Sequence, residues 1–88
     1  MFKRETYRLV LKGDTSEYIC GKIVGVIIAV TNSLARTGSY EKSDNNDCVF
    51  ITFDATKHQL NKILDFIARR YYKRFVCMQK MRITKRGL

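Results

Sequence analysis

Proline and tryptophan are absent from this 88-residue sequence, and histidine occurs once, at His58. A single histidine cannot form the His/His or Cys/His pairs that zinc sites need, and no Cys-x-x-Cys pair is present. The three cysteines, Cys20, Cys48 and Cys77, are odd in number and far apart, which argues against a disulfide framework. We therefore expect no bound metal, and free thiols in a reducing, cytoplasmic compartment.

Long hydrophobic runs are also missing. The longest, residues 23–30, has eight residues, whereas a membrane helix needs about 20. The N-terminus lacks the apolar segment of a signal peptide, and no glycine-rich phosphate-binding motif occurs. The sequence therefore predicts a protein without a membrane span or a cofactor.

Acidic residues stop at Asp65. The segment 66–88 contains eight Lys and Arg and no Asp or Glu, and the formal net charge of the whole chain is +9. Nearly all of the excess positive charge therefore lies in the last quarter of the sequence. Such asymmetry predicts an acidic partner, either nucleic acid or an acidic protein surface.

Alternating apolar and polar residues predict strands. In residues 6–12 the side chains of Tyr7, Leu9 and Leu11 share one face, and residues 48–53 alternate in the same way. Further strands are expected at 39–42 and 75–84. Residues 43–47, between the strands at 39–42 and 48–53, combine Ser, Asp and Asn, which is the strongest turn signal in the chain.

A long helix is expected over residues 16–36, with Asp14 or Thr15 as its N-cap and Gly38 after its end. Its apolar residues cover more than half of a helical wheel, so we expect burial on more than one side. The β-branched run 23–30 leaves a strand as the alternative for this segment.

Small residues repeat every four positions along this helix, at Gly21, Gly25 and Ala29. Such spacing lets a second backbone lie close. The second backbone would belong either to the chain's own core or to a second copy, in a homodimer through helix 16–36.

A second helix is expected to begin after Asp54 or Thr56 and to run to about Lys73. Thr56 and Gln59 have the spacing of a capping box. An apolar stripe at helical spacing follows, made of Leu60, Ile63, Leu64, Ile67 and Tyr71.

The element order β-α-β-β-α-β predicts an α+β fold. We expect a two-layer α/β sandwich in a ferredoxin-like arrangement, with an antiparallel sheet and both helices on one of its faces. Residues 1–88 are expected to form a single domain, frayed at 1–4 and 85–88.

The outer face of the second helix is the candidate binding site, because cations gather there around one aromatic ring, Phe66. Lysine and arginine contact phosphates, and an exposed ring can stack on a base or anchor a protein partner. Alternatively, Phe66 is an ordinary exposed apolar residue, or it packs against a tail or a second subunit. The predicted nucleic-acid-binding residues are Lys62, Phe66, Arg69, Arg70, Lys73, Arg74, Arg82, Lys85 and Arg86.

A second candidate surface is the sheet face that carries Arg8, Lys12 and Phe50. Residues 46–53 resemble the second half of the RNP1 strand of the RNA-recognition motif, with Phe50, Ile51 and Phe53 in matching places. The resemblance implies that Phe50 stacks on a base. The sequence departs from that family at Cys48 and Asn46, and residues 6–12 lack its second aromatic motif, so no family is assigned.

These features predict a small basic domain that binds nucleic acid, with RNA favoured over duplex DNA, and that catalyses no reaction. A small basic ribonuclease using Arg, Lys and Tyr is the catalytic alternative. The rival class is a protein-interaction module, a regulator or inhibitor that docks on an acidic protein surface.

Overall fold

The computed structural model describes residues 3–32 and 40–81. The elements follow the predicted order β-α-β-β-α-β. They are β1 (Glu5–Lys12), α1 (Glu17–Thr31), β2 (Glu41–Lys42), β3 (Cys48–Ala55), α2 (Lys57–Arg70), the short 3-10 helix η1 (Tyr72–Arg74) and β4 (Phe75–Lys80).

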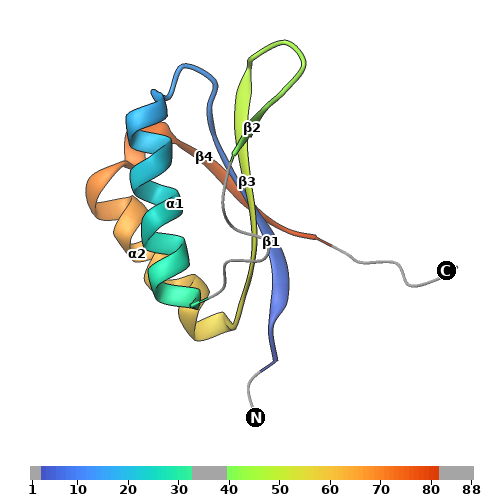
Figure 1. The fold of residues 1–88 in the computed structure, drawn as a ribbon, viewed down its shortest axis with the longest axis vertical. Helices are drawn as coiled ribbons and strands as arrows, with labels where there is room; N and C mark the ends of the chain where they lie inside the picture. The colour runs from blue at the N-terminus through green and yellow to red at the C-terminus, as the bar shows by residue number, and fades with distance from the viewer. Residues whose placement is uncertain (1–2, 33–39, 82–88) are drawn as a thin grey trace, which may run out of the picture.

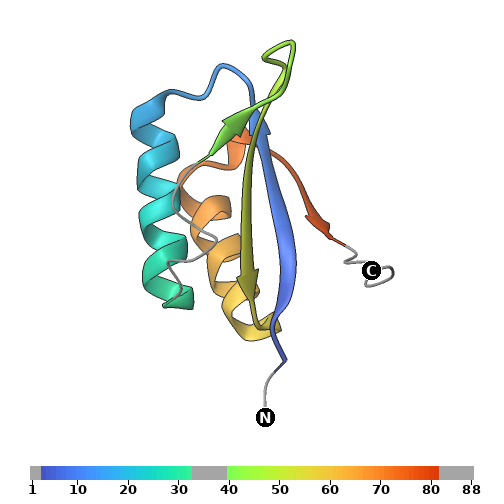
Figure 2. The same cartoon turned by 45° about the vertical axis from the view of Figure 1, so that its right-hand side comes forward.

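The four strands form one antiparallel sheet in the order β2-β3-β1-β4. Both helices lie on one face of this sheet, and the opposite face is open among the described residues (Figures 1 and 2). The structure thus confirms the predicted two-layer α+β fold and its ferredoxin-like arrangement. It also places β1 in the interior of the sheet and β4 at an edge.

The core lies between the sheet and the helices. Strand alternation sends Leu9 of β1 and Ile51 and Phe53 of β3 to the helical side, where each is fully buried. Ile63 and Ile67 of α2 are packed against this layer, with at most 1% of their surface exposed. The apolar stripe of α2 and the faces of the first and third strands are therefore as predicted.

Helix α2 begins with the predicted capping box. The Thr56 side chain accepts a hydrogen bond from the Gln59 N–H at 3.2 Å, and the Gln59 side chain accepts one from the Thr56 N–H at 2.9 Å. The helix ends at Arg70, so the predicted end at Lys73 is wrong. The chain tightens after Tyr71 into η1, which occupies the turn between α2 and β4.

Helix α1 differs from its prediction at both ends. Its N-cap is Ser16, whose Oγ accepts from the Ile19 N–H at 3.2 Å, and not Asp14 or Thr15. It ends at Thr31 because Asn32 adopts a left-handed conformation, with φ of 53°. The predicted end at Arg36 is therefore wrong, and Gly38 lies outside the described residues.

The remaining strands are shorter than predicted. β2 comprises only Glu41 and Lys42, and β4 ends at Lys80, with a bulge opposite Val10 and Leu11. The rest of the segment predicted as a strand, residues 82–84, lies outside the described part. The predicted turn at 43–47 is present and places Asn46 at φ of 61°.

Candidate nucleic-acid interface

Helix α2 presents cations to solvent. Lys62, Arg69 and Arg70 are all exposed. Arg69 is held by Asp65 one turn earlier, with 3.0 Å between Nε and Oδ2, while both side chains remain more than 60% exposed. An exposed pair of this kind contributes only about 0–1 kcal/mol, so a phosphate can compete for Arg69.

Phe66 lies among these cations, but it is not an isolated exposed ring. It is half-buried against the core, and its ring meets that of Tyr71 edge-to-face, with centroids 5.7 Å apart. Much of the ring therefore serves packing, and only part of its surface is available to a ligand.

The exposed aromatic ring of this region is Tyr72 in η1, which was not among the predicted site residues. Its surface is 63% exposed, and the Lys73 ammonium lies 6.0 Å from the centre of its ring. The structure gives Arg70 and Lys73 no acidic partner among the described residues. The sequence contained the Tyr-Lys pair, but only the break between α2 and η1 explains why the ring faces outward.

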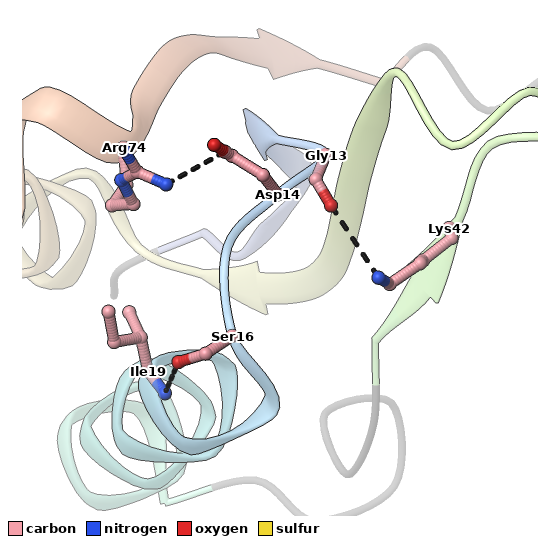
Figure 3. A network of polar contacts seen from close by, with 6 residues as sticks. All are labelled: Gly13, Asp14, Ser16, Ile19, Lys42 and Arg74. Atoms are coloured by element: carbon pink, nitrogen blue, oxygen red, sulfur yellow. Dashed lines mark hydrogen bonds and ion pairs between the residues drawn. The ribbon is translucent and has the colours of Figure 1, made fainter.

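Arg74 contacts the loop between β1 and α1 from one side, and Lys42 contacts the same loop from the other (Figure 3). The Arg74 Nη1 donates to Asp14 Oδ1 at 2.7 Å, which ties η1 to the loop between β1 and α1. On the other side of that loop, Lys42 of β2 donates to the Gly13 carbonyl at 3.5 Å. Arg74 therefore has a structural role that the sequence did not reveal, because its partner lies 60 residues away.

Lys80 is also paired with an acid that is distant in sequence. Its Nζ lies 3.0 Å from Glu5 Oε1, and this hydrogen bond lowers the pKa of the Glu5 carboxyl. Of the five cations described in residues 66–81, three are thus paired with acids: Arg69, Arg74 and Lys80. The other predicted cations, Arg82, Lys85 and Arg86, lie outside the described residues.

The second candidate surface lies on the open face of the sheet, where Arg8, Lys12 and Phe50 point away from the helices by strand alternation. The Arg8 guanidinium carbon lies 5.0 Å from the centre of the Phe50 ring. Its Nε is buried without a hydrogen-bond partner. Arg8 therefore covers the ring that the RNP1 resemblance implies for base stacking, while its own Nε lacks a hydrogen-bond acceptor.

A hollow that the sequence did not predict lies beside η1. It has a volume of about 220 Å³ and is lined by Leu64, Ile67, Ala68, Tyr72 and Phe75. Phe75 begins the edge strand β4, so the hollow opens between α2 and that edge. Finding it required knowledge of how α2, η1 and β4 pack.

Within residues 3–32 and 40–81, no helix is both long and apolar enough to cross a membrane. The same residues contain no group of three or more His, Cys, Asp or Glu side chains that could hold a metal ion. A scan against protein-family models finds no match, and neither do searches of curated proteins and of solved structures.

Proposed function

We propose that the protein is a small, non-catalytic domain that binds nucleic acid, with single-stranded RNA favoured over duplex DNA. The binding region is the cationic surface, defined as Lys62, Arg69, Arg70, Lys73 and Arg74, and extended by Arg82, Lys85 and Arg86. The observation that carries the proposal is the exposed Tyr72 ring with the Lys73 ammonium 6.0 Å from its centre. Lys73 and Arg70, which ends α2, are exposed cations without acidic partners in the described chain.

The combination of an exposed aromatic ring and unpaired cations suits single-stranded nucleic acid. Phosphates are neutralised by Arg and Lys, and an unstacked base can lie on an exposed aromatic ring, an interaction worth about 1–3 kcal/mol per base. The bases of a duplex are already stacked and offer no face to Tyr72. The three cysteines are free thiols, which supports a cytoplasmic location.

The salt dependence of binding tests the charge contribution. Changing Arg69, Arg70, Lys73 and Arg74 together to Gln should lower the slope of log affinity against log salt by roughly 2–4, since each lost phosphate contact removes about 1. Filter binding of single-stranded RNA from about 50 to 300 mM salt measures this slope.

A charge-matched control carries Gln at Lys3, Lys22, Lys42 and Lys57, which lie outside the cationic surface. It removes the same formal charge and should change the slope by less than about 1. Equal losses in the two variants, or no binding by the wild type at the lowest salt, would contradict the proposal.

Tyr72 tests the stacking contribution separately. Tyr72→Ala should weaken binding to single strands by about 1–3 kcal/mol without altering the salt slope, whereas Tyr72→Phe should retain most of the affinity. Tyr72 is a cleaner choice than Phe66, because Phe66→Ala would also disturb its contact with Tyr71.

A further inference from the structure

Strand β4 has only one neighbour among the described residues. It pairs with β1, and its other edge is unpaired in the sheet order β2-β3-β1-β4. The Met81 N–H donates to the Thr6 carbonyl at 2.8 Å. Because the backbone groups of an antiparallel strand point alternately to its two sides, the N–H groups of Met78 and Lys80 point to the unpaired edge.

The surface beside this edge is apolar. Three large hydrophobic side chains are exposed in the described chain, and two of them, Tyr72 and Val76, flank the start of β4, at 63% and 47% exposure. The hollow lined by Leu64, Ile67, Ala68, Tyr72 and Phe75 lies on the helical side of the same edge. A strand added next to β4 would direct every second side chain to that side.

The net charge around the edge is positive. Residues 66–81 contain no acid, and although Arg74 and Lys80 are paired with Asp14 and Glu5, Arg70 and Lys73 have no acidic partner among the described residues. A second copy of this chain would bring the same cations to the same edge, so charge disfavours pairing of β4 with itself. An acidic segment is complementary to these cations.

The size of the hollow limits its occupant. Sites for drug-sized molecules are about 300–1,000 Å³, whereas this hollow has about 220 Å³. A single Leu or Phe side chain of a docked peptide is a suitable occupant, and the remaining contacts would come from the backbone of β4.

We propose that the unpaired edge of β4 binds an extended acidic peptide segment of another protein as a fifth strand, with one apolar side chain in the hollow. Main-chain hydrogen bonds would provide affinity, while the hollow and the cations would provide specificity. This protein-docking proposal rests on the unpaired edge and the hollow and not on the nucleic-acid proposal, although both regions include Tyr72 and Lys73.

Backbone amide exchange tests strand addition directly. The probe is a capped nine-residue peptide in which Val, Leu or Phe alternates with Asp or Glu, and amide exchange is followed residue by residue by NMR. Met78 and Lys80 amides should exchange quickly in the free protein and at least tenfold more slowly with the probe. Gln79 already faces β1 and should change much less.

Two variants, each with a matched control, locate the site. Lys80→Pro removes an N–H from the unpaired edge without breaking the ladder to β1, so it should weaken probe binding at least tenfold. Lys80→Ala retains that N–H and should cost less than threefold. Ala68→Leu places a larger side chain in the hollow and should weaken binding at least tenfold, whereas Ala29→Leu on the exposed side of α1 should have no effect.

The proposal is wrong if the probe binds without protecting Met78 and Lys80. It is also wrong if the two Lys80 variants lose affinity equally, if Ala68→Leu binds normally, or if the wild type does not bind the probe. A peptide with Lys in place of Asp and Glu should not bind. RNA filter binding on the same variants keeps the two proposals separate, because Ala68→Leu should bind RNA normally.

Discussion

At the scale of single residues, Cys20 is the most protected of the three thiols. It is fully buried in α1, and burial raises its pKa, while Cys48 and Cys77 are only half-buried. A raised pKa means that less thiolate, the reactive form, is present at a given pH.

We therefore expect iodoacetamide at pH 8 to modify Cys48 and Cys77 well before Cys20 in the folded protein. Peptide mass spectrometry measures the three rates separately. In denaturant all three should react at similar rates. Modification of Cys20 as fast as Cys77 in the folded state would mean that α1 does not pack as described.

Ile63 and Ile67 connect α2 to the sheet. Both have at most 1% of their surface exposed, so truncation to Ala should lower the free energy of unfolding by about 2–5 kcal/mol each. Lys62→Ala on the exposed side of the same helix should change it by less than about 0.5 kcal/mol. Denaturant melts measure all three, and losses well below 1 kcal/mol at both isoleucines would contradict the packing of α2.

At the scale of elements, α1 contains two glycines that its packing does not require. A Cβ built on Gly21 or Gly25 meets no atom within 4 Å, and both residues are exposed. Each change to Ala should therefore stabilise the protein by roughly 0.5–1 kcal/mol, because Ala loses less backbone freedom on helix formation.

At Gly13 the change to Ala should have the opposite effect on stability. A Cβ there would lie 1.8 Å from the Asn46 carbonyl oxygen, where the two turns of the sheet touch. Gly13→Ala should destabilise the protein by about 1–3 kcal/mol. Thermal melts of the three variants provide the comparison, and destabilisation by Gly21→Ala or Gly25→Ala would show that another surface covers α1.

The sequence predicted the elements best where local signals agree with tertiary packing. The α2 capping box and stripe were predicted from Thr56, Gln59 and the isoleucines because those interactions span only a few residues. The α1 cap was predicted one or two residues too early: the helix begins at Glu17, so Ser16 is its cap, and Asp14 instead accepts a hydrogen bond from Arg74. The end of α1 was wrong because the left-handed conformation of Asn32 outweighs the apolar pattern that continues beyond it.

At the scale of the whole molecule, the binding surfaces were less predictable than the fold. Residues 66–88 have no acids, yet Asp14 and Glu5 reach this region through the sheet and neutralise Arg74 and Lys80. The Arg8–Phe50 contact joins two strands that are distant in sequence, and the hollow beside β4 depends on how the chain turns between α2, η1 and β4.

The homodimer through α1 remains a prediction. The large apolar residues of α1 are buried or half-buried, and its exposed side presents Tyr18, Gly21, Lys22, Gly25 and Ala29. If two copies pair along the small residues, Gly25→Leu should convert a dimer to a monomer. Light scattering at micromolar concentration, in enough salt to screen the +9 charge, measures the mass. A monomeric wild type would contradict the homodimer.

The position of β1 between β3 and β4 bears on how the chain acquires its structure during synthesis. Of the four strands, β1 is made first, and its partner on one side, Phe75–Lys80, is made last. At about 5–20 residues per second, translation from Lys12 to Lys80 takes roughly 3–14 s. During that interval one edge of β1 lacks its native partner and is open to pairing with a non-native strand.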